Sequence, residues 1–403
     1  MYDVIVVGAG PGGSSAAAFM AQSGQHVLLV DKEYFPRDKV CGDAVGGKSL
    51  DILSRLGVTK KLMKADALQT WGITFSAPSG DQISIPFSPE WDTPAFVCKR
   101  QSFDDLVFRA AEDAGVEIWQ GSEARGLLWT GDAVAGVTVA RPDGKQVDVR
   151  APLVVGADGA YSAVARGLGI DQLDKKHYVG AIRAYYEGVT GFNEGNYLEI
   201  HFVDTVIPGY FWIFPLPDGG ANVGLGMPSS VLKKRNIRMR ELLDQLVADR
   251  RFAPRFEGAR RVGKIRGWGL PLGSRPRKMA GNGWMLVGDA ASLIDPFSGE
   301  GIGNAVLSAS SAADWASTAR RTGDYSLSVL SGYQKEVLGL LRDELRVSHL
   351  MQKIARRKRL LNMVIRKASR SKELADTISC MFDDVGERRK LTSPLFYLRV
   401  LAA

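Results

Sequence analysis

The stretch Gly8-Ala9-Gly10-Pro11-Gly12-Gly13 lies close to the start of the chain and decides the fold of its first part. It follows a short apolar run, Asp3 to Val7, and precedes a run of mostly small residues, Ser14 to Ser23. The apolar run predicts a buried strand and the small-residue run predicts a helix, so the glycines form the turn between them. We therefore predict a strand, a tight turn and a helix over residues 3–23.

The three glycines of the spacing Gly-x-Gly-x-x-Gly each have a task in such a turn. Gly8 makes the turn, Gly10 lets the backbone approach a pyrophosphate, and Gly13 lets the helix pack closely on the strand. A second apolar run, His26 to Val30, ends in Asp31, which stands 18 residues after Gly13. A carboxylate at this distance accepts a hydrogen bond from a ribose hydroxyl. The sequence therefore predicts a dinucleotide-binding βαβ unit.

A glycine-rich segment late in the chain predicts the opposite wall of the same site. The apolar run Trp284 to Val287 predicts a buried strand, after which Gly288 turns the backbone so that Asp289 points at a sugar hydroxyl. Beyond Pro296, the segment Gly299-Glu300-Gly301-Ile302-Gly303 opens a helix. Its free backbone N–H groups favour an anion, either a pyrophosphate or the negative ring edge of a reduced flavin.

Two elements between these walls favour FAD over a nicotinamide cofactor. Val154 to Gly159 predicts a third buried strand with Asp158 near its end. Arg100 begins a predicted helix within reach of a pyrophosphate, although a lone arginine is equally compatible with a surface charge. With these elements, residues 1 to about 320 resemble the flavin monooxygenase and reductase superfamily of the p-hydroxybenzoate hydroxylase type. The sequence has no second Gly-x-Gly-x-x-Gly unit, so an external reductant, NADPH or a reduced electron carrier, is expected to visit the site.

The predicted FAD contacts combine these motifs with the resemblance. They are Gly8, Gly10, Gly13, Ser14, Asp31, Lys32, Cys41, Gly42, Ala44, Arg100, Ala124, Asp158, Gly288, Asp289, Pro296, Gly301 and Ile302. No metal site is expected, because the four histidines, His26, His177, His201 and His349, show no metal-like spacing.

Composition agrees with an enzyme of two domains. The chain has 403 residues, of which 45% are hydrophobic, and this is enough for a large core. Its three cysteines are few and odd in number, which favours a reducing compartment. No apolar run approaches the roughly 20 residues that span a bilayer. We expect a cytoplasmic protein.

The hydrophobic pattern changes more than once along the chain, which predicts interleaved domains. Short alternating segments such as Gln82 to Phe87, and the strand-like stretch Tyr178 to Gly226 with its Gly and Pro turns, predict an antiparallel sheet. We predict an α/β fold in which a Rossmann-type FAD-binding domain is interleaved with an antiparallel-sheet substrate domain, followed by a helical, basic C-terminal region. The predicted bounds are 1–72, 98–170 and 268–330 for the FAD-binding domain, 73–97 and 171–267 for the substrate domain, and 331–403 for the C-terminal region.

Two segments resemble those of one family within this superfamily. The first is Lys39-Val40-Cys41-Gly42-Asp43-Ala44-Val45-Gly46, and the second is Pro208-Gly209-Tyr210-Phe211-Trp212-Ile213-Phe214-Pro215. They are similar to segments of the geranylgeranyl reductase family, whose members use reduced FAD to saturate isoprenoid double bonds. Family members that reduce the chlorophyll side chain more often carry glycine in place of Asp43. The resemblance therefore implies a prenylated lipid or quinone substrate rather than a chlorin.

The aromatic side chains of the second segment are the predicted substrate-binding residues. Tyr210, Trp212 and Phe214 alternate, so they point to one face of a strand. That face is either an ordinary core surface or an apolar wall that binds a polyprenyl tail by area. Flavin halogenases carry a similar strand, so an aromatic hydroxylase or halogenase that uses O2 is the alternative function. A flavoprotein without catalytic activity is a third.

Cys41, Tyr210 and Trp212 are the predicted catalytic residues. Cys41 lies where the start of a helix would lower its thiol pKa, which makes it a candidate proton donor, or it is a small buried residue packed against the flavin. The sequence leaves both interpretations open. Cys98 and Cys380 have no comparable surroundings and are predicted to lie in the core.

The last seventy residues differ in charge from the rest of the chain. Residues 333–403 hold 16 Lys and Arg against 8 Asp and Glu, and Lys353 to Lys372 holds nine basic residues and no acidic one. Apolar residues recur there at near-helical spacing: Leu350, Ile354, Leu361, Ile365 and Ala368. This pattern predicts a basic amphipathic helix that lies on the anionic inner face of a membrane, or one that is docked on the protein with a solvated basic face. No nucleic-acid partner is expected, because no recognition motif accompanies the charge.

Overall fold

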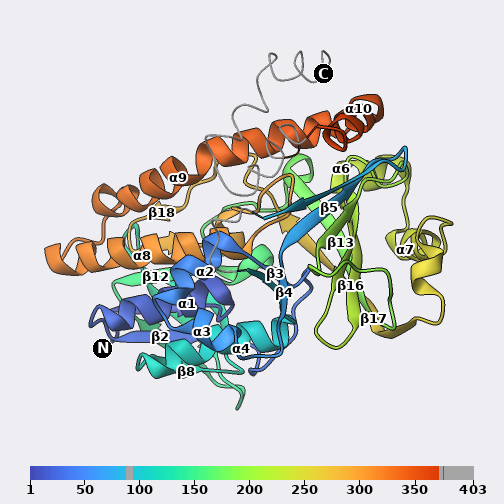
Figure 1. The fold of residues 1–403 in the computed structure, drawn as a ribbon. Coiled ribbons are helices and arrows are strands. Elements are labelled where there is room, and N and C mark those ends of the chain that lie inside the picture. The colour runs from blue at the N-terminus through green and yellow to red at the C-terminus, as the bar shows by residue number, and fades with distance from the viewer. Residues whose placement is uncertain (88–93, 372–374, 376–403) are drawn as a thin grey trace.

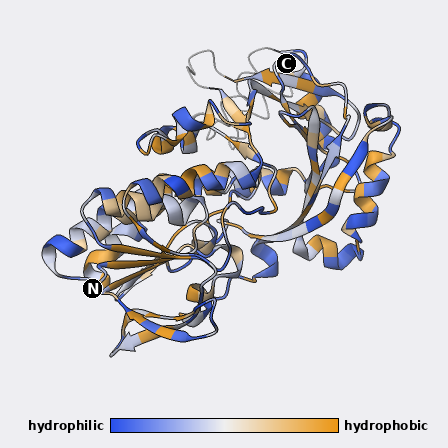
Figure 2. Cartoon of the chain, turned by 90° about the horizontal axis from the view of Figure 1, so that it is seen from below, coloured by the Kyte–Doolittle hydropathy of each residue, from blue (hydrophilic) through white to orange (hydrophobic). Residues whose placement is uncertain are grey.

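The computed structural model describes residues 1–87, 94–371 and 375, and within these residues two large sheets face each other (Figure 1). The first is a six-stranded sheet in the order β18-β19-β12-β1-β2-β8, parallel except at β18. Its strands are β1 (Val4–Val7), β2 (Val27–Val30), β8 (Glu117–Trp119), β12 (Leu153–Gly156), β18 (Ala280–Gly281) and β19 (Trp284–Leu286). Most are continuous apolar runs, because helices and other strands cover both faces of a parallel sheet. Figure 2 shows these strands as a block of hydrophobic colour.

Small residues let the helices pack closely on the six-stranded sheet and on one another. Helix α1 (Pro11–Gln22) lies against α8 (Ile302–Thr322), and a Cβ added at Gly12 would stand 3.3 Å from the Cβ of Ala305. Helix α4 (Arg100–Asp113) packs on the other side of α1. The remaining helices of this part are α2 (Gly47–Ser54), α3 (Val58–Leu62) and α5 (Ala163–Gly167).

Two three-stranded sheets complete the first domain and its border. One has the order β11-β10-β9 and packs next to β12, and the other has the order β3-β7-β4. Their strands are β9 (Glu123–Thr130), β10 (Ala133–Ala140), β11 (Gln146–Arg150), β3 (Ala44–Val45), β4 (Leu68–Thr70) and β7 (Ala95–Val97).

The second large sheet has seven strands in the order β17-β13-β16-β15-β14-β5-β6. Its strands are β5 (Gly72–Ser76), β6 (Gln82–Pro86), β13 (Tyr178–Glu187), β14 (Leu198–His201), β15 (Tyr210–Pro215), β16 (Gly220–Pro228) and β17 (Arg260–Pro271). One face carries a hydrophobic core under α6 (Ser229–Arg235) and α7 (Met239–Val247). The opposite face is turned toward the first domain. Among the described residues, β5 and β14 form the only parallel pair of this sheet, because β5 enters from the first domain rather than through a hairpin.

The predicted fold class is confirmed. A Rossmann-type parallel sheet alternates along the chain with a largely antiparallel sheet, and helices follow at the end. The numerical domain bounds stay predictions, since β3, β4 and β7 join segments from both sides of them in one small sheet.

The apolar spacing predicted one continuous helix near the C-terminus, and this prediction is wrong. The chain forms α9 (Leu327–Ile354), which runs across both domains, and then a separate α10 (Lys358–Ala368) (Figure 1). Leu361, Ile365 and Ala368 are buried against the seven-stranded sheet beside β6. Leu350, on α9, is 38% exposed and does not continue that buried face. Residues 355–357 separate the two helices, and α10 packs on the seven-stranded sheet.

Two further expectations concern the membrane and the end of the chain. Within 1–87 and 94–371, none of the helices combines the length and the apolarity needed to cross a bilayer. Cys98 is buried, as predicted, whereas Cys380 and most of the predicted basic tail after residue 371 lie outside the described residues.

Candidate active site

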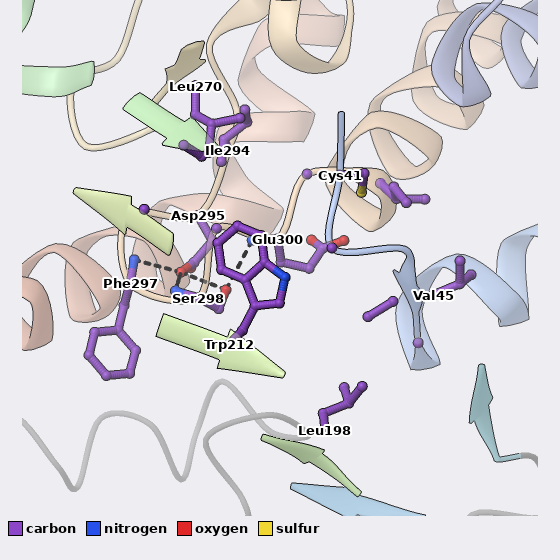
Figure 3. Close-up of a pocket in the computed structure, with 18 of the residues that line it drawn as sticks. Cys41, Val45, Leu198, Trp212, Leu270, Ile294, Asp295, Phe297, Ser298 and Glu300 are labelled. Atoms are coloured by element: carbon purple, nitrogen blue, oxygen red, sulfur yellow. Dashed lines mark hydrogen bonds between the residues drawn. The ribbon is translucent and has the colours of Figure 1, made fainter. Parts of the chain in front are cut away.

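A cavity of about 920 Å³ lies between the two large sheets. Its walls come from both domains, with Arg100, Asp289 and Gly301 on one side and the aromatic strand β15 on the other. Figure 3 shows Trp212 over the cavity, with Cys41 and Glu300 on the side of the first domain and Leu198 on the side of the second. Pro11 of the motif at residues 8–13 and Asp289, Gly299 and Gly301 of the motif at residues 288–303 line this cavity, so both glycine motifs border it. That the two motifs form opposite walls of one FAD site stays a prediction.

The glycine turn has the geometry that a bound pyrophosphate requires. Gly8 has a φ of +98°, and a Cβ at Gly13 would lie 1.7 Å from the Gly8 carbonyl oxygen, so both positions need glycine for the fold itself. A Cβ at Gly10 would meet only the Arg37 guanidinium, at 3.6 Å. Because the space in front of Gly10 is otherwise open, the turn fits a dinucleotide whose phosphates approach the backbone there.

The two predicted sugar-binding carboxylates lie at the expected strand ends. Asp31 follows β2, and its oxygens accept the backbone N–H groups of Ala9 at 2.6 Å and Glu33 at 2.8 Å. Burial raises the pKa of Asp31. Asp289 follows β19 and lines the cavity, where the Lys39 Nζ stands 3.3 Å from its carboxylate.

Arg100 is not the surface charge that one interpretation allowed. It is 3% exposed at the start of α4, and its guanidinium donates two hydrogen bonds, of 2.5 and 2.7 Å, to the Asp104 carboxylate. Arg37 pairs with the same carboxylate, and the two arginines lower the pKa of Asp104 against the opposing effect of burial. A buried guanidinium that lines the cavity supports the predicted contact with FAD, which stays a prediction.

Nine of the predicted FAD contacts are not among the residues that line the cavity: Gly8, Gly10, Gly13, Ser14, Asp31, Lys32, Ala124, Asp158 and Gly288. Asp158 accepts hydrogen bonds from Ser162 Oγ and from the backbone at Ala163, so its oxygens are used at the start of α5. Ala124 lies on β9 and is buried, and Lys32 follows Asp31. Their contacts with FAD stay predictions.

Glu300 lines the cavity and was not singled out from the sequence, although it stands inside the quoted glycine segment. Its side chain lines the cavity and is exposed there, and desolvation by the surrounding protein raises its pKa. The carboxylate accepts the Gly303 backbone N–H at 2.5 Å, at the N-terminus of α8. Glu300 uses the N–H of Gly303, and the predicted contact of this helix start with a pyrophosphate or a reduced flavin stays a prediction.

The three aromatic residues of β15 share one face, which confirms the predicted alternation. Tyr210, Trp212 and Phe214 all line the cavity, with ring centroids 6.0 and 6.2 Å apart in sequence order. The indole lies flat on the neighbouring strand, where a Cβ at Gly224 would stand 2.3 Å from it. The Tyr210 hydroxyl donates to the Ser298 carbonyl, which ties the aromatic strand to the glycine segment.

The thiol of Cys41 is not activated by a lowered pKa, so this part of the first interpretation is wrong. The side chain lines the cavity, and burial raises its pKa even though the Arg100 guanidinium opposes the shift. Helix α2 begins only at Gly47, so its N-terminus is too far from Cys41 to determine the pKa of the thiol. The thiol therefore keeps its proton at neutral pH.

Sequence reasoning missed the residues that hold the Cys41 turn. Asn222 donates to the Cys41 carbonyl and to Asp43, and Tyr185 donates to Asp43 as well. Asn222 stands opposite Phe214 on one side and Tyr185 on the other in the sheet register. No local pattern could have revealed them, because only the strand pairing brings these residues together.

The sequence is similar to known reductases along most of its length. A family profile described as "FAD binding domain" matches residues 1–194, and one described as "Geranylgeranyl reductase catalytic domain" matches residues 179–267. A menaquinone reductase of Mycobacterium tuberculosis is 35% identical over 311 residues, which are 74% of this chain and 72% of the relative. A digeranylgeranylglycerophospholipid reductase of Methanosarcina mazei is 34% identical over 328 residues, 81% of this chain and 77% of the relative.

The chain belongs to the geranylgeranyl reductase family. It is an FAD-dependent oxidoreductase, as the sequence predicted. A solved structure of a geranylgeranyl bacteriochlorophyll reductase-like protein from Thermoplasma acidophilum has a TM-score of 0.82 and 26% identity, with 95% of this chain and 97% of that chain covered.

Halogenases share only the fold with this family member. A flavin-dependent brominase superposes with a TM-score of 0.79 at 22% identity, covering 95% of this chain and 94% of that chain.

Within the described part of the chain, no three His, Cys, Asp or Glu residues gather in a way that could hold a metal ion.

Proposed function

We propose that this family member uses reduced FAD to saturate C=C bonds of a polyprenyl chain carried by a lipid or a quinone. The observation that carries the proposal is the single cavity, in which the FAD motifs and the aromatic face of β15 line opposite sides. The printed names of the relatives, a menaquinone reductase and a digeranylgeranylglycerophospholipid reductase, support a prenylated quinone or lipid.

The residues of the cavity fit an apolar chain without polar handles. Reduced FAD, held by the glycine turn, Asp31, Asp289 and the start of α8, would supply the hydride. Trp212, Phe214 and Leu198 offer apolar surface that binds a prenyl tail by area and excludes water. Because an isolated alkene is a poor hydride acceptor, protonation must lead or accompany the transfer, and aromatic faces stabilise the positive charge that develops.

Two of the predicted catalytic residues retain their protons in the resting site. Burial raises the pKa of the Tyr210 hydroxyl, and that hydroxyl already donates to the Ser298 carbonyl. The Cys41 thiol is protonated and lines the cavity. Of these two groups, only Cys41 therefore presents a proton that is not committed to a strong acceptor.

Two finer points complete the proposal. NADPH or a reduced electron carrier reduces the flavin from outside, since the sequence has only one dinucleotide-binding glycine motif.

The enzyme works at the inner face of the membrane, which its exposed basic residues contact electrostatically: Lys353, Arg356, Arg357, Lys358, Arg359, Arg366 and Arg370. The apolar face of α10 packs on the protein, so this contact is at the surface and does not insert the helix.

The decisive experiment is anaerobic turnover of the purified, chemically reduced enzyme. We expect a menaquinone or a geranylgeranyl phospholipid to gain two mass units per reduced double bond, without O2. O2-dependent hydroxylation or halogenation of an aromatic compound, with no hydrogenated prenyl product, would overturn the proposal.

Trp212→Ala separates a role in substrate binding from a role in the core. We expect turnover to fall at least about tenfold, far more than FAD content falls, because the indole lines the cavity. Truncating a buried core aromatic instead destabilises the fold by about 3 to 5 kcal/mol. A parallel loss of folding, FAD and turnover would therefore assign Trp212 to the core.

A further inference from the structure

The turn at Cys41–Asp43 carries a buried carboxylate that the proposed chemistry does not use. Asp43 is 0% exposed and has a φ of +66°, which is uncommon for a residue other than glycine. Its Oδ2 accepts the Tyr185 hydroxyl at 2.8 Å and the Asn222 Nδ2 at 2.8 Å. Its backbone carbonyl accepts the Cys98 N–H at 2.9 Å. A strained, buried position with this many partners is held by its surroundings.

Asn222 links Asp43 to the wall of the cavity through hydrogen bonds. Its Nδ2 also donates to the Cys41 carbonyl at 2.7 Å, and its Oδ1 accepts the Trp212 indole N–H at 2.9 Å. Because Asn222 is fully buried on β16, between β15 and β13, both ends of its amide are used within the protein. One orientation of the amide satisfies all three contacts.

Charged groups from β13, from α4 and from the loop that holds Asp38 surround this network. The Arg183 guanidinium lies 4.0 Å from the Tyr185 ring centroid and grips Asp38 with two bonds of 2.7 Å. Arg183 on β13 and Arg100 on α4 both attract the Asp43 carboxylate, while burial opposes its ionisation. The Tyr185 hydroxyl and the thiols of Cys41 and Cys98 are further titratable groups close to it.

We propose that Asp43 is a positioning residue that acts through Asn222 and thereby fixes the turn of Cys41 and the indole of Trp212 relative to each other. The inference rests on the proposed function, because it gives the network a role in aligning the prenyl chain with FAD. Gly42 fits the same arrangement, since a Cβ there would stand 2.9 Å from the Phe214 ring. The flavin-facing turn and the aromatic wall form one unit across the domain border.

Three variants test this arrangement. Asp43→Asn keeps an oxygen that accepts from Tyr185 and Asn222, so we expect kcat within about twofold of the wild type. Asp43→Ala and Asn222→Leu remove the contacts, and we expect kcat/KM at least about tenfold lower with FAD still bound. In both, the absorption spectrum of bound FAD should shift and the backbone amides of residues 40–46 should exchange faster with deuterium.

A double-mutant cycle with Trp212→Phe shows whether Asp43 acts through the indole. The phenylalanine keeps an aromatic ring on the cavity wall but lacks the N–H that Asn222 accepts, together with part of the area of the indole. We expect Asp43→Ala to lose most of its effect on kcat/KM in the Trp212→Phe background, because the two changes break one chain of contacts. Equal effects in both backgrounds would overturn the proposal.

These measurements distinguish failure of the positioning role of Asp43 from failure of the proposed function. If Asp43→Ala lowers only the melting temperature, with an unchanged FAD spectrum and unchanged deuterium exchange at residues 40–46, the positioning role is refuted. If Asp43→Ala does not fold, Asn222→Leu takes its place in the double-mutant cycle with Trp212→Phe. Absence of prenyl reduction by the wild type refutes the proposed function, while the spectrum and exchange still report on Asp43.

Discussion

At the residue scale, the glycines of the N-terminal turn separate folding from cofactor binding. The fold requires Gly13, whose added Cβ would stand 1.7 Å from a backbone oxygen, but it tolerates a side chain at Gly10. We expect Gly10→Val to leave the melting temperature of the apo-protein within a few degrees and to abolish FAD binding, because the side chain occupies the approach of the pyrophosphate.

Gly13→Ala is the matched control for that variant. It should lower the melting temperature and reduce soluble protein, since the helix can no longer pack on the strand. FAD released on denaturation of the purified protein, measured by absorbance, reports occupancy in both variants. Full flavin occupancy in Gly10→Val would contradict the assignment of this turn to the pyrophosphate.

A second prediction at this scale concerns the pH dependence of stability. Burial raises the pKa of Asp43 from 3.8 to about 6. Between these values the native state binds more protons than the unfolded chain, so the free energy of unfolding falls as pH rises through this window. At one pKa unit per roughly 1.4 kcal/mol, the contribution approaches about 3 kcal/mol.

Asp43→Asn has no carboxyl group to titrate at this position. The free energy of unfolding of the wild type, relative to that of Asp43→Asn, should therefore fall by up to about 3 kcal/mol between about pH 4 and pH 7. Urea titrations at several pH values measure this difference. Parallel pH profiles for the two proteins would show that Asp43 titrates normally.

At the scale of the element, α10 is held to the seven-stranded sheet by one apolar face. Ile365 is 4% exposed in a cluster that includes Ile83 and Ile85 of β6. We expect Ile365→Ala to loosen α10 by about 2 to 5 kcal/mol, and because the helix lies at the periphery the opening should be local. Deuterium exchange of residues 358–368 should then rise at least about tenfold.

The exposed Arg359→Ala provides the control on the same helix. It removes a long side chain from the solvated face, so exchange in α10 should change little. Similar acceleration by the two variants would mean that the buried face does not hold the helix.

At the scale of the whole molecule, exposed basic side chains are concentrated in the segment between the end of α9 and the start of α10. The exposed Arg356, Arg357 and Arg359 follow α9, whereas the apolar face of α10 is covered by the sheet. Each surface cation contributes about 1 kcal/mol toward an anionic membrane, and salt screens the attraction within about 10 Å at 0.1 M. Binding to liposomes should therefore require anionic lipid and weaken as salt rises.

Charge reversal tests the same surface. Replacing Arg356, Arg357 and Arg359 with glutamate should release the protein from anionic liposomes in co-sedimentation while FAD stays bound. Reversal of Lys60, Lys64 and Lys145, exposed residues of the first domain, changes the net charge equally and should weaken binding less. If the wild type ignores anionic liposomes at low salt, the enzyme does not bind membranes through this surface.

The sequence by itself determined the features that depend on local spacing. Gly8, Gly10 and Gly13 with Asp31 predicted the dinucleotide turn. Backbone conformation restricts Gly8 to glycine and close packing restricts Gly13 to it, whereas Gly10 leaves open space in front of the backbone. The alternation of Tyr210, Trp212 and Phe214 placed three rings on one face, since the period of a strand is two residues. These features need no knowledge of distant segments.

The tertiary structure alone decided what depends on distant neighbours. Strand pairing places Asn222 between Tyr185 and Phe214, and no spacing along the chain encodes that contact. The pKa of Cys41 rises because both domains bury it, an effect that outweighs the charge of Arg100. Likewise, α9 ends at Ile354 and a separate α10 packs on the sheet, although the apolar spacing is continuous in the sequence. Burial and partners are properties of the assembled fold, so periodicity cannot report them.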